Sequence, residues 1–342
     1  MREIIMRPEL AGRSFGGYPT IDFESRLVRG KRRLIGIPNR PMRSLHQHFD
    51  QFLRAVIRKL DSTGYGVRKL PSAFGCVKKS NPLRNAAQHR MGKYFYITDL
   101  TDAYHTVSLP RLAMLQTLLI HAEECADEFS LMHFGQNDQA SRLECHPSYQ
   151  PILDFLRAYF SGQHDTGLAI GGPLSPYLMN LYCEVYIDAP LRRLCEPRRI
   201  TYTRYVDDLV FSSESLIGAE TRRRIRRIIE SGGFTVNRRK SKVQAIAIGQ
   251  VSITQIGLAF EGEGMPARYV FSQRKRRKLH GIIHSYLTYG MDWPEKVSGY
   301  VAEFLYYYKN VAVKTATDRK TFELCKRFQA EWARYGGPKW KK

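Results

Sequence analysis

The stretch Tyr205-Val206-Asp207-Asp208-Leu209-Val210-Phe211 reads as two short strands joined by a turn that carries two adjacent carboxylates. Neither strand pairing nor core packing requires two like charges at this point, and their repulsion raises the free energy of the folded chain. A divalent cation bound between the two carboxylates would remove that cost. Asp-Asp is also a common turn pair, so the stretch alone leaves both a metal site and an ordinary turn open.

A third carboxylate follows another apolar run of strand length. The run from Tyr94 to Ile97 delivers Asp99 at its end. Two metal ions about 4 Å apart, held by acids from separate strands, activate a hydroxyl and stabilise a leaving pyrophosphate in nucleotidyl transfer. Three carboxylates suffice for Mg²⁺, because nucleotide phosphates and water supply the other oxygens. We therefore predict Asp99, Asp207 and Asp208 as metal ligands and catalytic residues.

The chain is strongly basic. Its 342 residues include 54 Lys and Arg against 32 Asp and Glu, which gives a net charge of +22. Such a field attracts phosphates and gains free energy from counterion release, so a polyanion is the expected partner, with an inert basic surface as the alternative. The six cysteines are spread singly, which favours reduced thiols, and no apolar run has the length of a membrane span. We therefore expect a cytoplasmic protein without a membrane partner.

Strand and helix patterns alternate around the acids. Apolar residues at helical spacing predict a helix over about residues 43–60, and Ser175-Pro176 reads as the N-cap and first position of another helix. From residue 272 onward the pattern is wholly helical and predicts a small bundle. This C-terminal segment holds 16 Lys and Arg against 6 Asp and Glu, so 10 of the net positive charges lie there.

Five motifs resemble those of the reverse transcriptases and occur in that family's order. The resemblance covers roughly residues 26–310. The motifs are Asp99-Leu100-Thr101-Asp102-Ala103-Tyr104, Gly171 to Pro176 with Asn180-Leu181, Tyr205 to Asp208, Asn237 to Ser241, and Thr254 to Leu258.

The resemblance implies an α+β fold of the right-hand polymerase type. We expect fingers over residues 1–90, a palm with an antiparallel sheet and helices over 91–265, and a basic helical thumb over 266–342. Residues 123–148 read as an insertion in the palm, since Asp99 and Asp207 are 108 positions apart. The implied activity is RNA-directed DNA synthesis from deoxynucleoside triphosphates with two Mg²⁺ ions, for which Mn²⁺ is an alternative.

The resemblance also assigns residues to the incoming nucleotide. Lys240 is expected to protonate or neutralise the pyrophosphate, and the ring of Tyr104 to exclude a ribose 2′-hydroxyl. A solvated lysine and a core tyrosine are the alternative interpretations. The remaining expected nucleotide contacts are Arg32, Arg33, Leu100, Asp102, Ala103 and Gly171.

Two basic clusters are candidates for binding nucleic acid. Arg274-Lys275-Arg276-Arg277-Lys278 opens the first thumb helix and is the preferred candidate for contacts with the primer-template backbone. Five arginines between Arg222 and Arg227 lie on one short helix. Either RNA binding or a solvated helix face explains them.

Within the superfamily the chain is most similar to retron and defence-associated bacterial enzymes. Arg33 to Pro38, Ala73-Phe74-Gly75 and the element Asn85-Ala86-Ala87-Gln88-His89 carry this resemblance. The last element is short, so a retron enzyme and a non-retron defence enzyme both remain open. The chain also departs from the family pattern at two places. Ala169-Ile170 replaces the usual Pro-Gln, and residues 253–257 interrupt the retron-type Val-Thr-Gly.

The resemblance implies a cognate structured non-coding RNA and an RNA/DNA hybrid as partners, in a role in antiviral defence. An effector protein encoded nearby is a further expected partner. Two other function classes remain open. One is an untemplated or protein-primed DNA polymerase, which Ile170 permits, and the other is a catalytically silent RNA-binding scaffold, against which the three acids argue.

Overall fold

The computed structural model describes residues 1–28, 31–62, 70–122, 143–254, 256–290, 294–311 and 314–334. Most of the expected insertion at 123–148 therefore lies outside the described residues. The chain forms two compact units, Met1–Ala245 and Ile246–Lys342. Within the described ranges no helix is long and apolar enough to cross a membrane.

The first unit begins with short helices and a hairpin. The elements are α1 (Arg2–Met6), α2 (Ala11–Ser14), β1 (Ile21–Val28), β2 (Lys31–Pro38), α3 (Arg40–Ser62) and α4 (Pro82–Ala87). Strands β1 and β2 pair antiparallel from Ile21 opposite Pro38 to Val28 opposite Lys31. Pro38 ends the second strand, and the Asn39 side chain accepts from the Met42 amide at 2.8 Å. The predicted helix is therefore present, but α3 begins three residues before the predicted start at residue 43.

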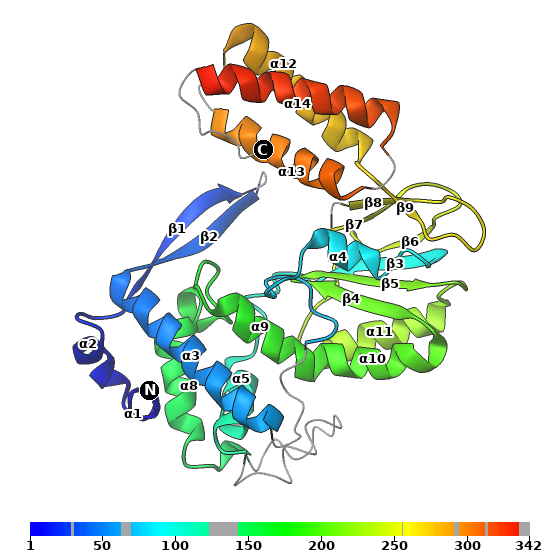
Figure 1. The fold of residues 1–342 in the computed structure, drawn as a ribbon. Helices are drawn as coiled ribbons and strands as arrows, with labels where there is room; N and C mark the ends of the chain where they lie inside the picture. The colour runs from blue at the N-terminus through cyan, green and yellow to red at the C-terminus, as the bar shows by residue number, and fades with distance from the viewer. Residues whose placement is uncertain are drawn as a thin grey trace. The chain divides into compact units, whose positions relative to one another are not determined.

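A four-stranded antiparallel sheet forms the centre of this unit (Figure 1). Its strand order is β4-β5-β3-β6, with β3 (Tyr94–Asp99), β4 (Thr201–Tyr205), β5 (Asp208–Ser213) and β6 (Lys242–Ala245). Tyr205 pairs with Asp208 across a two-residue turn, and Asp99 lies opposite Asp208 on the neighbouring strand. The two predicted strands around the Asp-Asp pair are thus confirmed.

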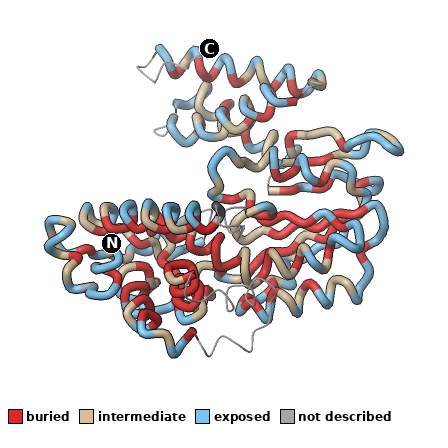
Figure 2. The backbone as a smooth tube through the Cα atoms, turned by 60° about the horizontal axis from the view of Figure 1, so that its bottom comes forward, coloured by how far each residue is buried: buried red, intermediate tan, exposed pale blue. Residues whose placement is uncertain are grey.

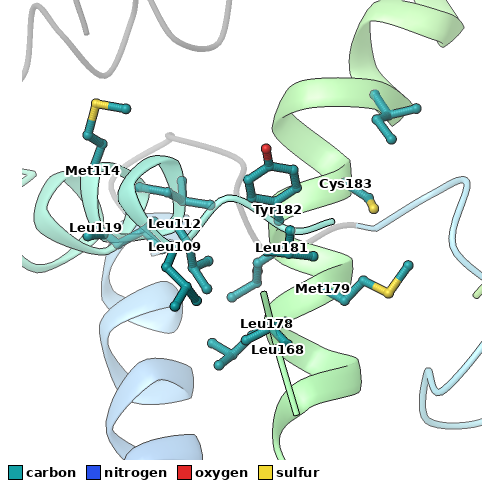
Figure 3. Packing of buried hydrophobic residues seen from close by; sticks show 14 of the residues in the cluster. Leu109, Leu112, Met114, Leu119, Leu168, Leu178, Met179, Leu181, Tyr182 and Cys183 are labelled. Atoms are coloured by element: carbon teal, nitrogen blue, oxygen red, sulfur yellow. The ribbon is translucent and has the colours of Figure 1, made fainter. Parts of the chain in front are cut away.

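Helices cover this sheet and form the larger core. They are α5 (Leu109–Ile120), α8 (Tyr149–Phe160), α9 (Ser175–Cys183), a π-helical turn (Glu184–Asp188), α10 (Ala189–Cys195) and α11 (Ala219–Ser231). Figure 2 shows buried positions along the strands and along one side of these helices. In Figure 3, Leu109 and Leu112 of α5 lie beside Leu181 of α9. These apolar side chains pack the two helices against each other.

One capping prediction is wrong by a residue. The N-cap of α9 is Leu174, and Ser175 is already helical. No side chain forms a capping hydrogen bond at the start of α9.

The second unit combines a small sheet with three helices. Strands β7 (Val251–Ile253), β8 (Ile256–Ala259) and β9 (Arg268–Val270) pair antiparallel in that order. Helices α12 (Gln273–Tyr289), α13 (Pro294–Asn310) and α14 (Ala316–Arg334) bury a separate core that includes Ile283, Phe304 and Phe328. The predicted helical bundle is present, and the whole chain is α+β.

Candidate functional site

The three predicted carboxylates meet where β3 and β5, the two inner strands of the four-stranded sheet, lie side by side. One oxygen each of Asp99, Asp207 and Asp208 lies within 4.8 Å of the other two. Asp99 ends β3, Asp207 occupies the turn, and Asp208 begins β5. The Leu100 amide donates to the Asp207 carbonyl at 2.9 Å, which ties the turn to the end of β3. Hydrogen bonding of the backbone therefore fixes where the carboxylates converge.

The electrostatics of this cluster favour a bound cation. Burial, together with the nearby charges of Asp207 and Asp99, raises the pKa of Asp208 to about 7. Burial and Asp99 also raise the pKa of Asp207. Crowded oxygen ligands that resist ionisation are the donor set that a hard divalent cation binds and neutralises. The cluster therefore fits a divalent metal.

Lys240 lies beside the carboxylate of Asp99. Its Nζ donates to Asp99 Oδ2 at 2.5 Å, and this hydrogen bond raises the pKa of the ammonium. The Asn237 amide donates to the Asp99 carbonyl at 2.8 Å, which anchors the segment that carries Lys240. With half of its side chain exposed, Lys240 can also reach a ligand in the solvent.

The loop after β3 brings Tyr104 toward the cluster. Asp102 adopts a left-handed conformation, and the Leu168 amide donates to the Tyr104 carbonyl at 2.8 Å. Burial raises the pKa of the Tyr104 phenol, and the nearby Cys76 and Asp207 raise this pKa further. The side chains of Leu100 and Ala103 are buried in the core, which leaves only their main chain for a nucleotide.

The hairpin of β1 and β2 contacts the loop that contains Gly171. The Gly36 amide donates to the Ile170 carbonyl at 2.6 Å. A Cβ atom on Gly171 would lie 2.3 Å from the Gly36 carbonyl oxygen, and Gly171 has a φ of +102°. Only glycine fits this close approach. On the same hairpin Arg32 and Arg33 are exposed, and the positive charge of Arg33 acts to lower the pKa of Asp207.

The basic cluster of α12 divides into paired and exposed side chains. Lys275 forms an ion pair with Glu303, and Arg276 donates to Asp318 at 2.6 Å. Arg274, Arg277 and Lys278 are exposed. The Lys278 ammonium also lies over the ring of Tyr300, 4.7 Å from its centroid.

The arginines of α11 are partly engaged within the protein. Arg222 donates to the Ile217 carbonyl, and Glu220 forms ion pairs with Arg223 and Arg224. The sequence alone did not assign these partners.

Sequence reasoning missed a buried polar group beneath the Asp turn. Arg204 and Asp188 have fully buried side chains and form an ion pair at 2.8 Å. The sequence signal was a single charged residue inside a predicted strand, Thr201–Tyr205, whose other residues are uncharged. Nearby, His89 of the Asn85 to His89 element lies between the hydroxyls of Thr203 and Ser212, both at 2.7 Å. That element therefore joins the two strands of the Asp hairpin.

Comparison with known proteins agrees with this geometry. The profile of the family "Reverse transcriptase (RNA-dependent DNA polymerase)" matches residues 22–281. The chain is 27% identical over 261 residues to the retron Mx65 reverse transcriptase of Myxococcus xanthus, covering 75% of this chain and 53% of that protein. It is 23% identical over 292 residues to the retron Ec86 reverse transcriptase of Escherichia coli, covering 84% of this chain and 77% of that protein. The chain thus spans about half the length of the first relative.

A solved structure of telomerase from Candida albicans, in complex with a TWJ fragment of telomeric RNA, covers 92% of this chain. The match covers 60% of the telomerase chain, with 12% identity and a TM-score of 0.45.

Proposed function

Because the chain belongs to the reverse transcriptase (RNA-dependent DNA polymerase) family, we propose that it copies RNA into DNA by metal-assisted nucleotidyl transfer. Its fold is the α+β right-hand polymerase fold of that family. The observation that carries the proposal is the convergence of Asp99, Asp207 and Asp208 within 4.8 Å. A scaffold that only bound RNA would have no need for three crowded carboxylates at the ends of two neighbouring strands.

In this proposal Asp99, Asp207 and Asp208 hold two Mg²⁺ ions, with Mn²⁺ as an alternative. When bound, the ions stabilise negative charge on the attacking 3′-hydroxyl and on the leaving pyrophosphate. Lys240, which carries its proton on Nζ beside Asp99, gives that proton to the pyrophosphate or neutralises its charge. Its pKa is raised by Asp99, so the ammonium stays charged in the free protein.

The remaining residues bind and select the nucleotide. Arg32 and Arg33 contact the triphosphate from the exposed end of the β1–β2 hairpin. The main chain at Leu100 to Ala103, with Asp102, and at Gly171 lines the nucleotide site. Tyr104 lies under the sugar, where its ring excludes a 2′-hydroxyl and so favours deoxynucleotides.

We assign residues 1–90 to fingers, 91–265 to a palm and 266–342 to a thumb. In the thumb, Arg274, Arg277 and Lys278 bind the backbone of the RNA/DNA hybrid, because these three residues are exposed and positively charged. Lys275 and Arg276 contribute mainly through their pairs with Glu303 and Asp318.

The template is proposed to be a cognate structured non-coding RNA, since relatives named as retron reverse transcriptases match this chain. A net charge of +22 supports continuous binding of one RNA. A role in antiviral defence, together with an effector protein, completes the proposal.

The catalytic part is tested with the variant Asp207→Asn. DNA synthesis on an RNA template with a DNA primer should fall by more than about 100-fold, because one metal ligand loses its charge. Binding of the primer-template should change little. The matched control is Asp154→Asn, which removes an exposed acid on α8 and should keep wild-type activity. Retention of more than about a hundredth of the wild-type rate by Asp207→Asn would refute the metal assignment.

The template is tested by purification from the native host, followed by sequencing of bound RNA and DNA. One discrete RNA with a DNA copy of part of it is the expected result. A heterogeneous RNA pool without a discrete DNA would contradict a dedicated template. DNA unrelated to any bound RNA would instead indicate untemplated or protein-primed synthesis.

A further inference from the structure

Directly beneath the Asp turn lies an arginine that the proposed chemistry does not use. Arg204 is on β4, two residues before Val206, and its side chain is 0% exposed. A buried guanidinium is costly unless each charge and donor is matched. The partners of Arg204 therefore indicate what the group does.

The guanidinium of Arg204 joins three segments of the chain. Its Nε donates to both carboxylate oxygens of Asp188, at 3.0 and 3.2 Å, and its Nη2 donates to Asp188 Oδ2 at 2.8 Å. Its Nη1 donates to Asn180 Oδ1 and to the Val206 carbonyl, both at 3.0 Å. The last contact holds the peptide that links Val206 to Asp207.

The turn itself needs such support. Val206 has a φ of +59°, a left-handed conformation that is unfavourable for a β-branched residue. Gly75 packs against it so closely that a Cβ atom on Gly75 would lie 2.5 Å from the Val206 nitrogen. Asn180 Nδ2 donates to the Gly75 carbonyl at 3.0 Å, so Asn180 connects Arg204 with the segment on the other side of the turn.

We propose that Arg204 is a positioning residue, which holds the Val206 carbonyl through Nη1 and so keeps Asp207 and Asp208 in the geometry that binds the catalytic cations. Asp188 and Asn180 fix the guanidinium for this task. The inference rests on the proposed function of the carboxylate cluster. The proposal predicts that cation binding depends on Arg204, although this buried residue contacts no cation, nucleotide or RNA.

If Arg204 and Asp188 form an ion pair that serves only the stability of the fold, a different experimental result is expected. Replacement of a buried ion pair by apolar side chains of similar size is often neutral for stability or even favourable. If Arg204 only stabilises the fold, such a replacement should keep both the fold and the cation site. If it positions the turn, the fold should survive while the cation site weakens.

The test is the triple variant Arg204→Met/Asp188→Leu/Tyr202→Phe. The third change is needed because the Tyr202 hydroxyl donates to Asp188 Oδ1 at 2.7 Å and would otherwise lose its partner. The matched control is Arg192→Met/Glu184→Leu, which removes an ion pair from the same helical segment without touching the turn.

Two readouts are measured for the wild type and both variants. One is the Mg²⁺ concentration that gives half of the cation-induced rise in Tm, and the other is the Mg²⁺ dependence of DNA synthesis. In the triple variant we expect the first concentration to rise by about tenfold or more and kcat to fall by about 100-fold or more. The control variant should resemble the wild type in both.

A triple variant with the wild-type Mg²⁺ requirement and kcat would overturn the proposal. Should it fail to fold, Arg204→Lys provides the decision, because lysine keeps a positive charge beside Asp188 but has a single nitrogen, which cannot also hold Asn180 and the Val206 carbonyl. An unchanged Mg²⁺ requirement in a folded Arg204→Lys protein would also overturn the proposal. If the wild type binds Mg²⁺ but makes no DNA, the proposed function fails while the Tm readout still tests the positioning role.

Discussion

Replacement of Asp208 by asparagine should make the metal-free protein more stable while it abolishes DNA synthesis. Asp208 is confined with Asp99 and Asp207, and burial together with these charges raises its pKa from 3.8 to about 7. In the unfolded chain the same carboxyl ionises near its ordinary pKa. Above about pH 7 the folded protein must therefore carry a charge that its surroundings disfavour.

The magnitude follows from the size of this shift. A shift of about three pKa units corresponds to about 4 kcal/mol, and solvent that still reaches the side chain reduces this to about 2 to 4 kcal/mol. Between about pH 4 and pH 7 the unfolded chain has already released the proton that the folded protein retains. The stability of the wild type should therefore fall as the pH rises through this window and then level off.

The assay is thermal unfolding in a metal chelator at about pH 5 and about pH 8. For a unit of this size, Asp208→Asn should raise Tm by about 5 to 15 °C at the higher pH and by much less at the lower pH. Added Mg²⁺ should stabilise the wild type at the higher pH but give the variant little, because the variant lacks one ligand.

Asp102→Asn is the matched control for charge. It removes a carboxylate three residues after Asp99, Asn also tolerates the left-handed conformation at this position, and Asp102 is not part of the cluster. The difference in Tm between Asp102→Asn and the wild type should be the same at the higher and at the lower pH. If Asp208→Asn were no more stable than the wild type at the higher pH, the reasoning that the cluster is destabilised without a cation would be refuted.

Three further perturbations test the proposed roles of single groups. Tyr104→Val should increase incorporation of GTP relative to dGTP by about tenfold or more, and an unchanged ratio would make Tyr104 a core residue. Lys240→Met should lower kcat by about 100-fold and remove the fall of the rate at high pH that deprotonation of Lys240 causes; a wild-type pH profile would contradict its role as an acid. Neutralising Arg274, Arg277 and Lys278 with glutamine should weaken primer-template binding for all sequences and reduce the salt slope by about one unit per lost contact. Loss of binding for one sequence alone, with the same slope, would indicate base recognition instead.

The sequence by itself determined the elements and the acids that they carry. Short runs of strand-forming residues on both sides of the Asp207-Asp208 pair predicted β4 and β5, and helical spacing predicted α3, α11 and the three helices of the second unit. These patterns are local, because each element must bury one face wherever it lies in the fold. The ends of the predicted strands β3 and β4 therefore also located the three carboxylates.

Other features depended on tertiary structure. The sequence did not pair Lys275 with Glu303 or Arg276 with Asp318, so all five basic residues of the cluster looked equally available. The resemblance assigned Leu100 and Ala103 to the nucleotide site, whereas their side chains are buried in the core. Pairing and burial depend on which distant segment packs against a residue, and periodicity carries no information about that segment.

Arg204, buried under the Asp turn, shows most clearly that a sequence pattern does not predict the tertiary partners of a residue. Arg204 is the single charged residue of its strand, and Asp188 and Asn180 lie on a helical segment more than one element away. Only the packing of α9 and its π-helical extension against β4 brings these groups within hydrogen-bonding distance. The carboxylates were predictable because strand ends place them, whereas the arginine that holds their turn became visible only when the helix and the strand were in contact.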